Sequence, residues 1–141
     1  MGSSGAAPET PTLARAVLGI IFLYHGLVPK ILFLSQTEIR MIQAHGISWP
    51  PEQVALIAGV AEILLGLALI FLRTSTWPIL VALGSLVLLL IDVAIFSPGL
   101  LVEAFNPVSS NLAAIGLCVI ALAQHKERLK DRSHYAVEKL L

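Results

Sequence analysis

Four apolar runs, each close to the length that a helix needs to cross a bilayer, constrain this chain more than any other feature. A hydrocarbon core about 30 Å thick requires roughly 20 residues at 1.5 Å per residue. Charged residues make up only 13% of the chain, whereas a soluble domain carries about 25%. The sequence therefore predicts an all-α membrane protein, a four-transmembrane-helix antiparallel bundle whose partner is the lipid bilayer. The helices are expected at about residues 13–34, 53–72, 77–96 and 108–123.

The two ends of the chain differ from this apolar middle. Residues 1–12 are small and polar and include two prolines, which is typical of a disordered leader; whether they are native stays open. Residues 124–141 carry charges of both signs and are expected to form a cytoplasmic charged tail, a helix that is either solvated or in contact with anionic lipid. The formal net charge of the chain is zero, so no general attraction to nucleic acid is expected.

The distribution of Lys and Arg predicts the orientation of the bundle. With four spans, the N-terminus, the turn after the second span and the tail share one side, which holds seven of the nine basic side chains. Because basic segments stay in the cytoplasm, both termini are predicted to be cytoplasmic, in a bacterial inner (plasma) membrane. The seven are Arg15, Arg73, Lys126, Arg128, Lys130, Arg132 and Lys139; the two on the outward side are Lys30 and Arg40.

Ionisable residues inside the predicted spans indicate a site, because a charge in hydrocarbon is unfavourable unless it is paired. From the helical rise, Lys30, Asp92 and Asn111 share a level roughly 6 Å below the outward boundary. His25 and Glu62 share a second level, roughly 14 Å down. We therefore expect Lys30 to pair with Asp92, and His25 with Glu62. The alternative exchanges partners, since a lysine at position 30 is long enough to reach Glu62.

Glycine and proline predict where the first two helices are unusual. Gly19 and Gly26 on the first helix, and Gly59 and Gly66 on the second, place small residues on one face of each helix, where another backbone can approach closely. Pro29 lacks an N–H, so a carbonyl one turn earlier loses its helical partner, and a kink or a free acceptor is expected there.

Seven residues are candidate ligand contacts, and structural roles compete for some of them. Lys30 and Asp92 are also explained as an ion pair that only joins helices. For Asn106 and Asn111, helix capping and helix–helix hydrogen bonding are favoured over ligand contact. The lone Cys118 is expected to be a small buried hydrophobe. No metal site and no cofactor motif is recognised in the chain, and whether it is an enzyme stays open. The candidates are Tyr24, His25, Lys30, Glu62, Asp92, Asn106 and Asn111.

Three segments together resemble the DoxX-like family of small membrane proteins. They are Arg15–Gly19 followed by Tyr24–Lys30, then Ala58–Glu62 with Gly66, and Phe105–Pro107 with Asn111. The resemblance covers about residues 13–123 and implies a four-helix membrane bundle. By residue match it points to Lys30, Glu62 and Asn106, with His25 and Asn111 nearby. Some relatives are tied to sulfur oxidation with quinone as the electron acceptor, and others to redox-stress complexes or to membrane-protein assembly.

Two hypotheses about function follow. In the first, an outward-facing buried polar pocket binds a lipophilic small molecule such as a quinone, and the chain is a candidate subunit of a membrane redox system. Lys30, His25 and Glu62 would then bind the polar head group, and apolar stripes would take the tail. In the alternative, the chain is a structural or assembly protein that packs against other membrane proteins or a second copy, and the buried charges only fix helix register.

Overall fold

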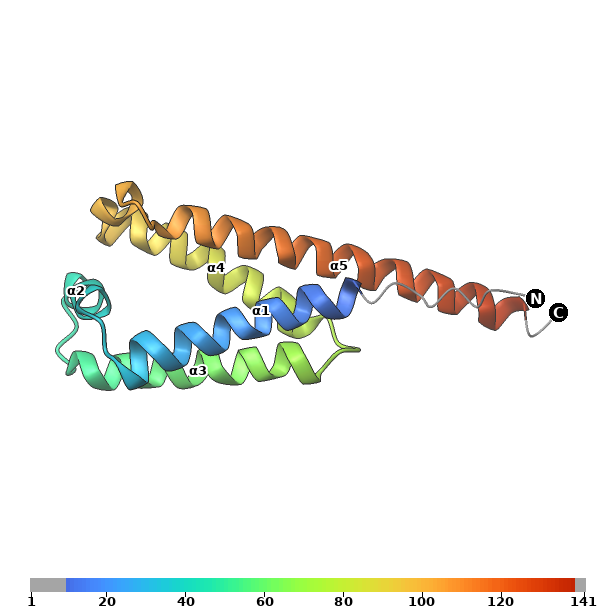
Figure 1. Cartoon of the computed structure of the whole chain (residues 1–141), viewed down its shortest axis with the longest axis horizontal. Coiled ribbons are helices and arrows are strands. Elements are labelled where there is room, and N and C mark those ends of the chain that lie inside the picture. The colour runs from blue at the N-terminus through green and yellow to red at the C-terminus, as the bar shows by residue number, and fades with distance from the viewer. Residues whose placement is uncertain (1–9, 139–141) are drawn as a thin grey trace.

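Four long helices run in alternate directions in the computed structural model, which describes residues 10–138 (Figure 1). They are α1 (Thr10–Leu27), α3 (Pro51–Phe71), α4 (Trp77–Phe96) and α5 (Pro107–Glu138). Each contains a stretch long and apolar enough to cross a membrane. The prediction of an all-α, four-helix membrane bundle is therefore confirmed.

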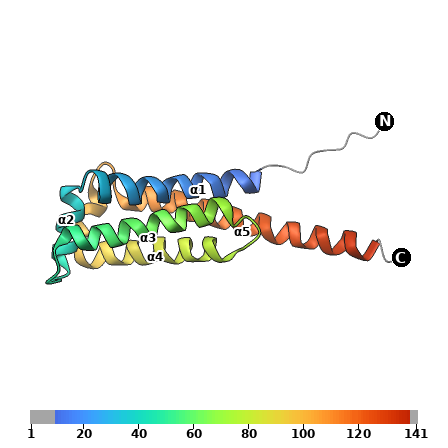
Figure 2. The same cartoon turned by 90° about the horizontal axis from the view of Figure 1, so that it is seen from below.

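The ends of the helices follow local sequence signals. α3 and α4 both carry a proline within their first two positions, and Glu52 lies in the first turn of α3, where an acid is favourable. α1 begins at Thr10, so the last three residues of the expected leader are helical, and its first nine lie outside the described residues. α5 continues without a break through Glu138 and extends past the other helices (Figure 2), so that the fourth span and the described part of the tail form one helix. Residues 139–141 of the expected tail lie outside the described residues.

The loop between the first two spans contains a short helix that the sequence analysis did not anticipate, α2 (Gln36–Ala44). Ser35 caps it, because the Ser35 hydroxyl accepts a hydrogen bond from the backbone N–H of Glu38 at 3.1 Å. A serine followed three residues later by glutamate is the sequence signature of such a helix start. A 3₁₀ segment, η2 (Pro98–Val102), likewise shapes the loop between α4 and α5.

Pro29 changes the helix instead of breaking it. After Leu27 the chain continues as a π-helical segment, η1 (Val28–Leu32), and the N–H of Phe33 reaches back five residues to the carbonyl of Val28 at 2.9 Å. The missing N–H of Pro29 removes one link of the ordinary ladder, and the wider turn absorbs the loss. Such segments are frequent at functional sites, and this one carries Lys30.

α1 and α3 touch through their backbones at two glycine pairs. A Cβ atom built on Gly26 would lie 2.5 Å from the carbonyl oxygen of Gly59, and one on Gly59 would lie 2.6 Å from that of Gly26. Gly19 and Gly66 meet in the same reciprocal way, at 2.8 Å in both directions. The expectation that these four glycines are packing residues is confirmed, and no larger side chain fits at these crossings unless the helices move apart.

Arg15, which was not among the candidate site residues, is buried, with 5% of its surface exposed. Its guanidinium donates hydrogen bonds to the carbonyls of Leu69, Leu72 and Ser75, at 3.2, 2.6 and 2.9 Å. These carbonyls lie at the end of α3 and in the turn after it, where the helix leaves acceptors unpaired and its dipole favours a cation. Arg15 therefore fastens the start of α1 to the α3–α4 turn.

The core lies along the bundle axis and large apolar side chains cover the outside. The fully buried side chains include Leu18, Leu69, Ile79, Val93 and Cys118, which confirms that the cysteine is a buried hydrophobe. Many large apolar residues of the four spans point outward and are exposed. A soluble protein rarely exposes so much apolar surface, whereas lipid tails match it, so the described surface is that of an integral membrane protein.

Candidate functional site

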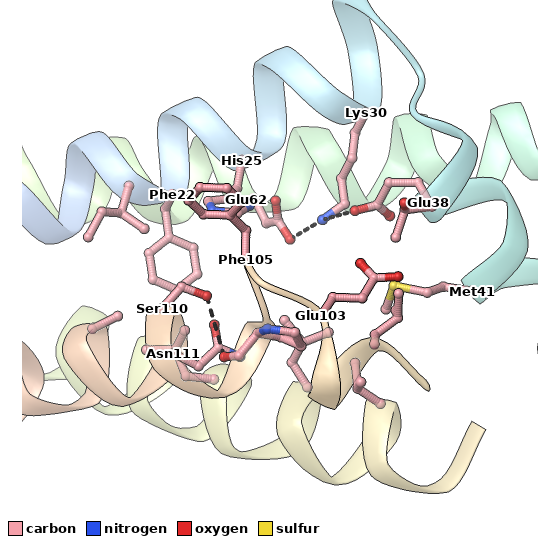
Figure 3. Close-up of a pocket in the computed structure, with 18 residues that line it drawn as sticks. Phe22, His25, Lys30, Glu38, Met41, Glu62, Glu103, Phe105, Ser110 and Asn111 are labelled. Carbon is pink, nitrogen blue, oxygen red and sulfur yellow. Dashed lines mark hydrogen bonds and ion pairs between the residues drawn. The ribbon is translucent and has the colours of Figure 1, made fainter. Parts of the chain in front are cut away.

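One cavity joins four of the seven candidate residues at the end of the bundle that carries α2 and η2 (Figure 3). Its volume is about 310 Å³, which lies at the lower end of the range for small-molecule sites. Side chains from all four long helices line it, and α2 and the loop before α5 add further walls. Its polar lining residues are His25, Lys30, Thr37, Glu38, Glu62, Glu103, Ser110 and Asn111, and its apolar ones include Ile21, Phe22, Met41, Leu86, Leu89, Val93, Leu100, Phe105 and Ala114.

Lys30 is the centre of the polar wall. Its ammonium donates to Glu62 Oε1 at 2.5 Å and lies 3.7 Å from Glu38 Oε1. Only 10% of the Lys30 side chain is exposed, so both carboxylates meet a cation that is largely removed from water. The two contacts join η1 to α3 and to α2, and Figure 3 shows the three side chains in one row.

The glycine crossing explains why Lys30 reaches Glu62. Lys30 lies one turn beyond Gly26 on the first helix, and its Cβ would be 3.1 Å from a Cβ atom built on Gly59. The Cβ atom of Glu62 lies in the same way 3.0 Å from one built on Gly26. Because the two backbones touch between these residues, the long lysine side chain bridges the crossing. The glycines thus position the ion pair.

The two expected pairings were wrong, and of the exchanged pairs only Lys30 with Glu62 is present among the described residues. Lys30 binds Glu62 instead of Asp92. Asp92 is bound by His45, whose Nε2 lies 2.7 Å from Asp92 Oδ1. His25 lines the cavity, with its ring edge-on to that of Tyr24, and forms no described ion pair with Glu62. The depth calculation failed because it compared the levels of backbones, while a lysine side chain spans more than a helical turn.

His45 fastens the end of α2 to the end of α4. Its ring packs on that of Phe96, with centroids 4.2 Å apart, and its Nδ1 lies 2.7 Å from the carbonyl oxygen of Met41. That carbonyl can only accept, so Nδ1 carries a proton and donates it in a hydrogen bond. Nε2 can then also donate to the Asp92 carboxylate only when the ring is protonated. Accordingly, the Asp92 hydrogen bond, and secondly the Met41 carbonyl, raise the pKa of His45 above its ordinary value of 6.5.

Rising pH is therefore expected to loosen α2. A raised pKa in the folded protein means that the His45–Asp92 contact stabilises fully below pH 6.5 and that this stabilisation is lost as pH rises through the raised value. Hydrogen exchange over residues 36–46, corrected for intrinsic rates, should show protection that falls across this window. The Asp92→Asn variant should show weaker protection at low pH and little change with pH. Equal pH dependence in the two proteins would contradict the assignment.

The other candidates divide between the cavity wall and supporting positions. Asn111 lines the cavity, whereas Tyr24, Asp92 and Asn106 do not. Tyr24 is 60% exposed on the outer surface of α1. Asn106 caps α5: its Oδ1 accepts from the N–H of Ser109 at 3.0 Å, and its Nδ2 donates to the carbonyl of Glu103 at 3.1 Å. The favoured capping interpretation of Asn106 is thus what the contacts show.

Two carboxylates in the wall, Glu38 and Glu103, were missed by the sequence analysis. Both lie in segments that were treated as loops between spans, so neither counted as buried in the membrane. The position of Glu38 could have been found from the sequence, because Ser35 followed by Glu38 is a helix-capping pattern. That pattern predicts a helix in this loop and thereby a fixed direction for the Glu38 side chain. Glu103 has no such signal, because its position depends on how the η2 loop folds back over the bundle.

Two buried polar atoms in the wall have no hydrogen-bond partner among the described residues. One is Glu62 Oε2, since the contact of Lys30 is to Oε1, and the other is Asn111 Nδ2. Asn111 as a whole is only 8% exposed. Buried polar groups are normally paired, and here an unpaired acceptor and an unpaired donor belong to residues that line one cavity.

The cavity wall carries more negatively charged side chains than positively charged ones. Among the described residues that line the cavity, three carboxylates (Glu38, Glu62 and Glu103) accompany one ammonium, that of Lys30. Among the side chains that the structure describes, no group of three or more His, Cys, Asp or Glu is arranged to hold a metal ion. The site is thus suited to hydrogen bonding and has an excess of acceptors.

Comparison with known families and proteins gives one match. The model of the DoxX-like family matches residues 19–119, which include η1, α2, α3, α4 and the first part of α5. No curated protein and no solved structure matches the chain. The matched range contains every residue named above as lining the cavity.

Proposed function

The chain belongs to the DoxX-like family, and from this premise we propose that it binds a lipophilic small molecule with a polar head group in the cavity around Lys30 and Glu62. The observation that carries the proposal is the cavity itself, in which unpaired polar atoms share one space with apolar side chains of the bundle. A ligand of this kind satisfies both parts of the wall, since its head pairs with the polar atoms and its tail lies against the apolar ones.

The orientation of the proposed site follows from the basic residues. If both termini are cytoplasmic, the cavity opens toward the outer side of the membrane, near its surface. A lipophilic molecule would reach it from the outer leaflet, and its polar head would stay close to the interface. α2 is one wall of this cavity through Thr37, Glu38 and Met41, so its movement would control entry.

A quinone is the ligand class that the family suggests, and its binding to the wild-type protein is the first test. We expect a short-chain ubiquinone or menaquinone analogue to bind the protein in nanodiscs, and the Glu62→Gln variant to bind it with an affinity changed by about tenfold, which corresponds to roughly 1.4 kcal/mol. The Glu52→Gln variant changes an exposed acid outside the cavity and should bind as the wild type does. Equal affinity of the wild type and Glu62→Gln would remove Glu62 from the site.

A role in a membrane redox system would need a partner in addition to this ligand. The chain carries no recognised cofactor motif, so electrons would come to a bound quinone from another protein or from a substrate. Purification of the protein from native membranes with a redox protein attached would support this role. The assembly hypothesis predicts instead that changes of the polar wall leave function intact, which is tested by the double variant described in the Discussion.

A further inference from the structure

One of the two unpaired atoms in the residues of the cavity wall is a hydrogen-bond acceptor and the other is a donor. This difference restricts the chemistry of the head group that can pair with both. Glu62 Oε2 can only accept when the carboxylate is ionised, while Asn111 Nδ2 can only donate. Lys30, the strongest donor in the wall, is already engaged by two carboxylates. A head group that only accepts would leave Glu62 Oε2 unpaired, and one that only donates would leave Asn111 Nδ2 unpaired.

We propose that the ligand of this cavity carries a hydroxyl head group, a phenol or hydroquinone rather than a quinone or an ether. This inference rests on the proposed function and narrows it. A hydroxyl donates one proton and accepts through its lone pairs, so it satisfies an acceptor such as Glu62 Oε2 and a donor such as Asn111 Nδ2. The terminal torsion of a glutamate side chain is broad, and the carboxylate can therefore turn Oε2 toward the occupant.

The excess of carboxylates leads to the same preference. Glu38 and Glu103 add acceptors around the cavity, and no second ammonium accompanies Lys30 among the described lining residues. A hydroxyl near these groups forms charge-assisted hydrogen bonds, which are stronger than neutral ones. A quinone carbonyl can accept from Asn111 Nδ2 but offers no proton to these carboxylates, and an anionic head would be repelled by them. The wall therefore favours the reduced form of a quinone over its oxidised form.

The experiment compares a phenol with its methyl ether, which keeps the ring and the tail and removes the donor. Para-nonylphenol and para-nonylanisole are partitioned into nanodiscs that carry the wild-type protein, and empty nanodiscs of the same lipid provide the background. We expect the phenol to bind at least about tenfold more tightly than the ether, which corresponds to about 1.4 kcal/mol. Neither compound undergoes quinone redox chemistry, so the comparison reports hydrogen bonding alone.

Variants assign the preference to particular atoms. Asn111→Leu keeps a side chain of similar size and should weaken phenol binding, and Glu62→Gln should reduce the ratio between phenol and ether to a few-fold. Gln124→Leu is the matched control, because Gln124 Oε1 is also buried and unpaired but lies outside the cavity wall. It should leave both affinities unchanged.

The outcomes separate this inference from the proposed function. Equal binding of phenol and ether by the wild type overturns the hydroxyl inference and leaves an amphiphile site in place. Absence of binding by either compound, and by the quinone analogues, overturns the proposed function itself. If the tenfold preference for the phenol persists in both Asn111→Leu and Glu62→Gln, other atoms bind the hydroxyl. The assignment of the hydroxyl contacts to Glu62 and Asn111 would then be wrong.

Discussion

Gly26→Ala is expected to destabilise the protein by about 1–3 kcal/mol, the usual effect of forcing an extra carbon into a packed contact. The new methyl group would lie 2.5 Å from the carbonyl oxygen of Gly59, a backbone atom that has no rotamer to relieve the overlap. The helices would have to separate at their closest crossing. Gly59→Ala should behave alike, since its Cβ meets the carbonyl of Gly26 at 2.6 Å.

Two other glycines provide matched controls for this prediction. Gly84 in α4 and Gly116 in α5 also lie inside long helices, but a Cβ on either meets nothing within 4 Å. Alanine there should be neutral or stabilising by up to about 1 kcal/mol, because it favours the helix over glycine. Thermal unfolding in detergent, followed by circular dichroism, measures all four variants. A Gly26→Ala protein that unfolds no earlier than Gly84→Ala would show that the α1–α3 contact is looser than described.

The Lys30→Met variant is expected to lose roughly 3 kcal/mol of stability, the lower end of the range for breaking a buried ion pair. Without the ammonium, the carboxylates of Glu62 and Glu38 would face each other across a site that is largely removed from water. Arg40→Met is the control, since it removes a cation from the same end of the bundle at an exposed position. It should change stability by no more than about 0.5 kcal/mol.

The double variant Lys30→Met with Glu62→Leu then separates the two functional hypotheses. Removing both charges leaves no pair to break, and apolar replacements of a buried pair are often neutral or stabilising, so most of the lost stability should return. If the charges only fix helix register, the folded double variant keeps its function. If they bind a head group, it folds but no longer distinguishes a phenol from its ether. Wild-type ligand binding by the folded double variant would contradict the proposed function.

The sequence by itself determined the membrane class, the number of spans and the small faces of the first two helices. These are local properties: the length of an apolar run compared with the thickness of a bilayer, and the spacing of Gly19, Gly26, Gly59 and Gly66 along a helix. It gave Lys30 with Glu62 only as the alternative to the expected pairing of Lys30 with Asp92, on the ground that a lysine side chain is long enough to reach Glu62.

Only the tertiary structure decided which charges meet. α2 folds back over the bundle and brings His45 to Asp92 and Glu38 to Lys30, and the η2 loop brings Glu103 to the same cavity. Such contacts depend on the packing of segments distant in the chain, and neither helix periodicity nor depth in the membrane encodes them. The crossing at Gly26 and Gly59 was expected as a close contact, but its angle and the π-helical turn at Pro29 set where Lys30 points. Those are properties of two helices in contact rather than of either sequence alone.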